Sequence, residues 1–133
     1  HRESFKDLVN GHIDILFANE SEITALYESS NFQSALEQVK VNCKLAALTC
    51  GEKGSVIVEG ENLFTIPPRT LAKVVDTTGA GDLYAGGFLY GYTQGESIYK
   101  CGLIGSLCAG QIITQLGPRS QVLLKKIVEN YFN

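Results

Sequence analysis

Short apolar segments alternate with segments of helical periodicity along this chain. Residues 12–19 ("HIDILFAN") and 44–51 ("KLAALTCG") have the continuous apolar character of buried strands. Residues 20–29 and 32–42 carry apolar residues three and four positions apart, as amphipathic helices do, and Asn31 is a candidate N-cap. Strands that alternate with helices bury both faces of a sheet. The pattern therefore predicts an α/β layered fold.

The second half of the chain continues with a hairpin and then helices. Residues 54–68 ("GSVIVEGENLFTIPP") predict two strands joined by a Gly-Glu-Asn turn, and residues 72–76 ("AKVVD") predict another short strand. Three helices are then expected over 82–94, 96–115 and 120–132. The second of these is apolar almost all round, which predicts that it is buried.

Length and charge exclude several classes of protein. The chain has 133 residues, which suit one compact domain, and a net charge of −3. No basic run of the kind that binds nucleic acid or an acidic membrane surface is present. The apolar segments are too short to cross a bilayer, and residues 1–12 do not resemble a secretory signal. We therefore predict a cytoplasmic protein without nucleic-acid or membrane partners.

The four cysteines agree with that location. Cys43, Cys50, Cys101 and Cys108 form no C-x-x-C pair, and their neighbours are mostly apolar or small. Zinc ligands need a closer arrangement of thiols and imidazoles than this. We predict buried free thiols in a reducing compartment.

Residues 74–87 ("VVDTTGAGDLYAGG") place Gly79, Ala80 and Gly81 at the start of an expected helix. The first N–H groups of a helix lack intrahelical acceptors and carry partial positive charge, so they attract anions. Residues with almost no side chain let a phosphate approach the backbone closely. The segment therefore predicts a phosphate cradle.

Asp82 complicates this interpretation because a carboxylate repels a phosphate. Either Asp82 caps the helix, or it accepts a proton from a hydroxyl group that attacks phosphorus. Known phosphate loops do not decide the matter. No Gly-Lys-Ser/Thr of a Walker A loop occurs, and Tyr84 breaks the G-x-G-x-x-G dinucleotide fingerprint.

Several segments resemble one protein family, in the family's own order. "DTTGAGD" at 76–82 resembles the second signature of the ribokinase-like (PfkB) carbohydrate kinases. "NESE" at 19–22 is similar to that family's N-x-x-E element, and "TCGEKG" at 49–54 to its T-x-G-x-x-G element. "QLGPRS" at 115–120 resembles its C-terminal glycine loop. The longer segments "GHIDILFANESEI" at 11–23, "DTTGAGDLYAGGFLYG" at 76–91 and "GPRSQV" at 117–122 most resemble bacterial adenosine kinases and sugar kinases.

The resemblance implies a ribokinase-like layered α/β/α fold and a role for each residue of the glycine segment. Asp82 would be the catalytic base that deprotonates the acceptor hydroxyl for attack on the γ-phosphate of ATP. The N–H groups of Gly79, Ala80 and Gly81 would form the anion hole for the transferring phosphoryl group.

The resemblance also implies magnesium and nucleotide contacts. Asn19 and Glu22 would hold magnesium with the ATP phosphates, largely through water. The alternative is structural, with Asn19 ending a strand and Glu22 serving as a first-turn helix acid. Thr49, Gly51 and Gly54 would line the nucleotide phosphates and ribose, although Gly54 also suits a simple turn.

Further contacts are implied nearer the C-terminus. Asp76 and Thr78 would shape a monovalent cation site, potassium in some relatives. Ser106 and Gly117 would contribute to the adenine pocket. Ribokinase itself tends to carry Asn where Ser106 stands, which is a departure from the family pattern.

By this resemblance, residues 1–133 correspond to the C-terminal ATP-binding and catalytic-base part of a kinase domain. The expected reaction transfers phosphate from ATP to a hydroxymethyl group of a sugar or nucleoside. Most acceptor contacts and the lid would lie in an N-terminal part outside these residues, so this chain alone is expected to be weakly active or inactive. Its partner would be that part, or a second copy in a homodimer.

The sequence is also compatible with two other functions. The first is a catalytically silent nucleotide-binding remnant or a subunit completed by another chain. The second is a Rossmann-type oxidoreductase domain, which needs an acid about 20 residues after its glycines. The acid nearest to that spacing is Glu96, and Tyr84 breaks the dinucleotide fingerprint, which argues against an oxidoreductase domain.

Overall fold

The computed structural model describes residues 15–68 and 79–113. The chain divides into two compact units, His1–Thr65 and Ile66–Asn133. The expected strand at 72–76, the expected helix at 120–132 and the residues Gly117 and Pro118 lie outside the described residues.

The first unit is built on a four-stranded sheet with the order β1-β2-β3-β4. The strands are β1 (Leu16–Asn19), β2 (Leu45–Thr49), β3 (Ser55–Glu59) and β4 (Asn62–Ile66). β1 and β2 are parallel, whereas β2 and β3 are antiparallel, so the sheet is mixed. The turn at Gly60, with φ of 59°, connects β3 to β4 and confirms the predicted hairpin.

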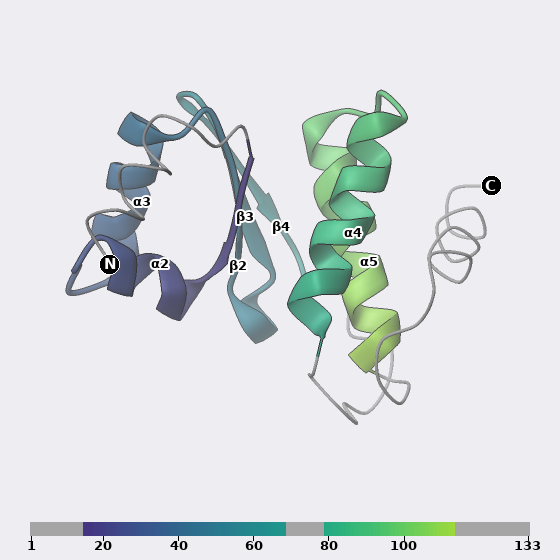
Figure 1. Ribbon diagram of the computed structural model, residues 1–133, viewed down its shortest axis with the longest axis horizontal. Coiled ribbons are helices and arrows are strands. Elements are labelled where there is room, and N and C mark those ends of the chain that lie inside the picture. Colours follow the sequence, from purple (N-terminus) through teal and green to yellow (C-terminus); the bar gives the residue numbers. More distant parts are fainter. Residues whose placement is uncertain (1–14, 69–78, 114–133) are drawn as a thin grey trace. The chain divides into compact units, whose positions relative to one another are not determined.

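Two helices connect β1 to β2 and lie on one face of this sheet (Figure 1). They are α2 (Glu20–Leu26) and α3 (Phe32–Asn42). Both begin where the sequence predicts, because each has an asparagine at its N-cap. The Asn31 side-chain oxygen accepts the Ser34 N–H at 2.9 Å, which supplies one of the acceptors that the first turn lacks.

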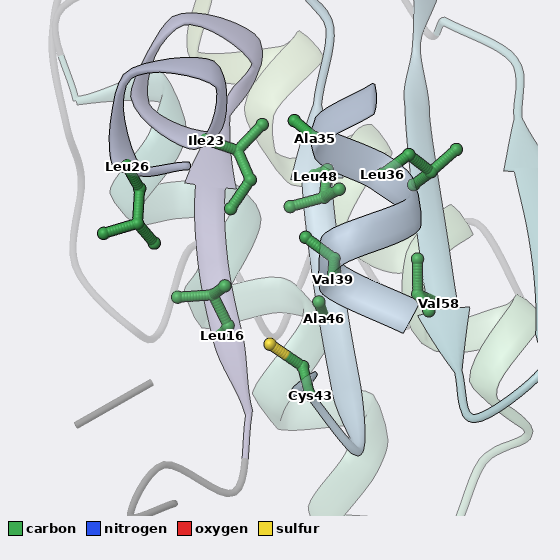
Figure 2. Packing of buried hydrophobic residues seen from close by; sticks show 10 residues of the cluster. All are labelled: Leu16, Ile23, Leu26, Ala35, Leu36, Val39, Cys43, Ala46, Leu48 and Val58. Carbon is green, nitrogen blue, oxygen red and sulfur yellow. The ribbon is translucent and has the colours of Figure 1, made fainter. Parts of the chain in front are cut away.

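The core of this unit fills the space between the two helices and the sheet (Figure 2). α3 contributes its predicted apolar stripe, with Ala35 and Val39 at 0% exposure. The other buried members come from β1, α2, α3 and its C-cap, β2 and β3: Leu16, Ile23, Leu26, Leu36, Cys43, Ala46, Leu48 and Val58. Burying one Leu or Ile side chain stabilises the fold by roughly 1.5–3 kcal/mol, so this cluster sets the position of β1 and β2.

The cap of α3 gives a direct test of this local structure. Asn31→Ala removes the acceptor for the Ser34 N–H and is expected to lower the free energy of unfolding by about 1 kcal/mol. Asn31→Ser retains a capping oxygen and should stay close to the wild type. Chemical denaturation followed by circular dichroism measures both variants. Equal midpoints for the alanine and serine variants would show that the cap contributes nothing.

The described part of the second unit is a pair of adjacent antiparallel helices, α4 (Ala80–Thr93) and α5 (Ile98–Ile113) (Figure 1). Glycines let their backbones approach closely. A Cβ on Gly87 would lie 3.0 Å from the Ile104 carbonyl oxygen and 3.1 Å from the Gly105 Cα. A Cβ on Gly105 would lie 2.8 Å from the Tyr84 carbonyl oxygen. The expected burial of α5 is confirmed at Cys101, Ile104, Leu107 and Cys108.

The cysteines are free thiols, as predicted. Cys43, Cys101 and Cys108 are buried, whereas Cys50 is half-buried. Burial raises the pKa of Cys101 and of Cys108 to about 11, so both thiols are protonated at neutral pH. None of the helices in the described segments combines the length and apolarity needed to cross a membrane.

Candidate functional site

The N-terminus of α4 has the open backbone that a phosphate cradle requires. Gly79 is the N-cap, with φ of 80° and ψ of 0°, and supplies no side-chain hydrogen bond. The Leu83 N–H donates to the Gly79 carbonyl at 3.0 Å and begins the intrahelical ladder. The N–H groups of Ala80, Gly81 and Asp82 therefore precede the ladder. Gly81 is exposed, and among the described residues no atom lies within 4 Å of a Cβ added to it.

Asp82 is the third residue of α4 and is exposed to solvent. The alternative in which Asp82 caps the helix is wrong, because the N-cap is Gly79. In the first turn its carboxylate still interacts favourably with the helix dipole, by about 0.3–1 kcal/mol. The carboxylate and the open N–H groups thus belong to one helical turn. Chemically, this turn can bind an anion and also accept a proton.

A second set of candidate residues lies at the edge of the sheet where β1 and β2 end. The parallel register aligns Asn19 with Thr49. The carboxyl ends of adjacent parallel strands meet at the same edge, where α/β proteins commonly bind ligands. The fold therefore brings together the N-x-x-E and T-x-G-x-x-G elements, which are thirty positions apart in the sequence.

Asn19 and Glu22 form a capping box at the start of α2. The Glu22 N–H donates to Asn19 Oδ1 at 2.8 Å, and the Asn19 N–H donates to Glu22 Oε1 at 2.8 Å. The structural alternative for these residues is therefore confirmed. Their role toward magnesium stays a prediction.

The capping box is compatible with magnesium. Both residues are exposed, and an ionised carboxylate offers about four acceptor positions, of which the cap uses one. Magnesium keeps several waters and needs few protein ligands. Within residues 15–68 and 79–113, no group of three or more His, Cys, Asp or Glu side chains is placed to hold a metal. A magnesium ion at the β1–β2 edge would therefore depend on water and substrate phosphates for most of its ligands.

The loop after β2 has a backbone conformation that favours glycine at two positions and is held by the loop's own hydrogen bonds. Gly51 has φ of 57° and Gly54 has φ of 94°, and residues other than glycine adopt such angles only with strain. The Cys50 N–H donates to the Gly54 carbonyl at 2.8 Å, and the Gly54 N–H to the Gly51 carbonyl at 3.1 Å. Gly51 is exposed, so a ligand can approach its backbone. Gly54 is buried and ends the short 3₁₀-helix Gly51–Lys53, in keeping with a turn-forming role.

Sequence reasoning missed one feature of this loop. Lys53 Nζ lies 3.5 Å from Glu20 Oε2, so an ion pair joins the loop to the first turn of α2. Burial raises the pKa of the nearby Cys50 thiol, with Glu20 acting in the same direction and Lys53 opposing it. The available signal was the presence of opposite charges immediately after Asn19 and immediately before Gly54.

The residues predicted for the adenine and monovalent cation sites are only partly described. Ser106 is buried in α5, and its hydroxyl donates to the Pro67 carbonyl at 3.4 Å. This bond gives Ser106 a structural role, and its contact with adenine stays a prediction. Asp76, Thr78 and Gly117 lie outside the described residues.

The sequence profile described as "pfkB family carbohydrate kinase" matches residues 1–125. The chain belongs to this family. The predicted ribokinase-like fold is confirmed by solved structures. The adenosine kinase from Sinorhizobium meliloti matches 98% of the chain with a TM-score of 0.92 and 48% identity. An Arabidopsis thaliana ribokinase complexed with ribose and ATP matches 92% of it with a TM-score of 0.78 and 26% identity.

Among curated proteins, this PfkB-family chain is 38% identical over 106 residues to a protein named as an uncharacterized sugar kinase from Archaeoglobus fulgidus. That match covers 79% of the chain and 42% of the relative. The Sinorhizobium and Arabidopsis matches cover 40% and 43% of those proteins. The chain thus spans about two fifths of the length of the kinases it resembles.

Proposed function

We propose that this chain supplies the ATP-binding and catalytic-base part of a cytoplasmic kinase, which phosphorylates a hydroxymethyl group of a sugar or nucleoside. The observation that carries the proposal is the first turn of α4. There the glycine N-cap leaves N–H groups open, and the exposed Asp82 carboxylate lies in the same turn. Membership of the PfkB family supports the same chemistry, since relatives are named as sugar, nucleoside and adenosine kinases.

The proposed reaction is a direct phosphoryl transfer. Asp82 takes the proton of the acceptor hydroxyl as its oxygen forms a bond to the γ-phosphorus of ATP. The bond between that phosphorus and the β,γ-bridging oxygen breaks, and ADP leaves. The N–H groups of Gly79, Ala80 and Gly81 stabilise the charge on the transferring phosphoryl group. Exposed Asp82 is free to reach a small-molecule acceptor.

The remaining contacts follow from the β1–β2 edge. We assign Asn19 and Glu22 to a hydrated magnesium ion and Thr49, Gly51 and Gly54 to the nucleotide phosphates and ribose. Magnesium would neutralise phosphate charge during the transfer. A potassium site at Asp76 and Thr78, adenine contacts at Ser106 and Gly117, and acceptor contacts from an N-terminal part or a second copy complete the proposal.

One observation favours a second function. The open N–H groups at the start of α4 can hold a nucleotide phosphate without any transfer, which suits a nucleotide-binding subunit that needs a partner chain. Because residues 1–133 alone are expected to be weakly active or inactive, the test uses the native polypeptide, whose intact mass is measured first. Incubating it with MgATP and a panel of sugars and nucleosides distinguishes the two functions. Phosphorylated product, identified by mass spectrometry and absent with an acceptor that lacks its hydroxymethyl oxygen, supports the kinase. ATP binding without any product supports the binding subunit.

A further inference from the structure

The ion pair between Lys53 and Glu20 lies at the β1–β2 edge, among the residues assigned above to nucleotide and magnesium. Glu20 follows Asn19 directly, and Lys53 lies between Gly51 and Gly54 in the loop after β2. The aligned pair Asn19 and Thr49 connects the same two segments through the sheet. The lysine is therefore a positive charge within a set of residues that the proposed function assigns to a polyanion.

This ion pair is too exposed to lock the two segments together. The Lys53 side chain is 75% exposed and the Glu20 side chain 37% exposed, with 3.5 Å between Nζ and Oε2. Exposed pairs of this kind shift an equilibrium by roughly fivefold at most. The ammonium group of Lys53 can therefore leave Glu20 at little cost when a more highly charged partner arrives.

The backbone beneath Lys53 is fixed even though its ammonium group is not. The Lys53 N–H donates to the Cys50 carbonyl at 3.1 Å, and glycines with positive φ lie on both sides of the lysine. A flexible lysine that starts from a fixed point suits a phosphate ligand, because its ammonium acts as a mobile point charge with three donors. The triphosphate of ATP carries several negative charges and is a stronger partner than one carboxylate.

We propose that Lys53 binds the polyphosphate of the nucleotide and that Glu20 holds its ammonium group until the nucleotide arrives. This inference rests on the proposed function, because it assumes a nucleoside triphosphate at the β1–β2 edge. Glu20 then acts as an intramolecular competitor that lowers the apparent affinity for the nucleotide. Removing either partner of the pair should therefore change that affinity, but in opposite directions.

The test compares Lys53→Met and Glu20→Gln in the purified protein, with ATP and inorganic tripolyphosphate as probes. Isothermal titration calorimetry measures Kd at low and at high salt. Lys53→Met is expected to weaken both ligands by about tenfold at low salt, and by less at high salt. Glu20→Gln is expected to tighten both by roughly two- to fivefold. Lys53→Arg should keep most of the affinity.

Lys44→Met is the matched control. Lys44 is exposed and stands just before β2, at the end of that strand opposite Lys53, so its loss changes net charge equally. Circular dichroism checks that each variant is folded. A Lys53→Met affinity equal to that of Lys44→Met would overturn the proposal. Parallel weakening by Lys53→Met and Glu20→Gln would also overturn it, because a merely structural pair would behave in that way.

The proposed function and this inference can fail separately. If the Lys53→Met variant phosphorylates its acceptor normally and binds ATP as the wild type does, the proposed function stands and the role of Lys53 is refuted. The opposite result is a protein that phosphorylates nothing, whose affinity for tripolyphosphate falls with Lys53→Met and rises with Glu20→Gln. That result would support the role of Lys53 and refute the kinase activity. A wild-type protein that binds neither probe contradicts both.

Discussion

Asp82→Asn is expected to lower kcat for phosphoryl transfer by about 10²–10⁴-fold, because asparagine keeps the shape of the side chain but cannot take the acceptor proton. ATP affinity should be unchanged or higher, since the variant removes a negative charge from the helical turn proposed to hold a phosphate. Because Asp82 is exposed, the variant loses only the interaction of the carboxylate with the α4 dipole. The free energy of unfolding should therefore fall by about 0.3–1 kcal/mol. Steady-state kinetics and a separate measurement of ATP Kd check both expectations.

The matched control for this variant is Glu37→Gln. Glu37 is also an exposed helical acid, but it lies on α3, pairs with Lys40 at 3.4 Å, and is not one of the proposed site residues. Its kcat and Kd should equal those of the wild type. If Asp82→Asn also kept wild-type turnover, Asp82 would not be the base, and the mechanism proposed for this chain would have to be abandoned.

Gly87→Ala is expected to lower the free energy of unfolding by about 1–3 kcal/mol, as overpacking of a close helix contact does. The added Cβ would meet Cys108 Sγ at 2.9 Å and, at 3.0–3.1 Å, backbone atoms of Ile104 and Gly105. The thiol can rotate away, whereas the two backbone contacts require α4 and α5 to separate. Gly105→Ala should behave similarly, because its Cβ would lie 2.8 Å from the Tyr84 carbonyl oxygen.

Gly81→Ala provides the comparison for stability. Gly81 lies in the same helix as Gly87, yet no described atom lies within 4 Å of a Cβ placed there. Alanine favours helix over glycine, so the denaturation midpoint should stay the same or rise. Urea denaturation of the three variants ranks them. If Gly87→Ala proved as stable as Gly81→Ala, the close approach of α4 and α5 would not exist in solution.

Most local features of the fold could be predicted from the sequence. Asn31 predicts the start of α3 as its N-cap, because capping depends on hydrogen bonds within three residues. The hairpin turn at Gly60 could be predicted for the same reason, since a tight turn depends on residues that are neighbours in the sequence. The start of α4 was placed two residues too late, at Asp82 rather than Ala80, because a glycine N-cap gives no side-chain signal.

The candidate site could be predicted only in part. The residues of "DTTGAGD" were recognised from their types and order, and Asp82 stays the proposed base. For Asn19 and Glu22 the sequence leaves a structural role and a magnesium role as alternatives, and the capping box bears only on the structural one. The pairing of Lys53 with Glu20 was missed, since nothing in either segment alone indicates which charge lies nearby.

The sequence by itself determined where most elements begin, which residues are apolar enough for the core, and that a carboxylate follows a glycine-rich helix start. These properties depend on interactions between residues a few positions apart. Only the tertiary structure decided that Asn19 lies beside Thr49, that Gly87 faces Gly105, and that the Ser106 hydroxyl is bonded to Pro67. Such contacts join residues about 18 to 39 positions apart, and they form only when strand register and helix packing bring distant segments together.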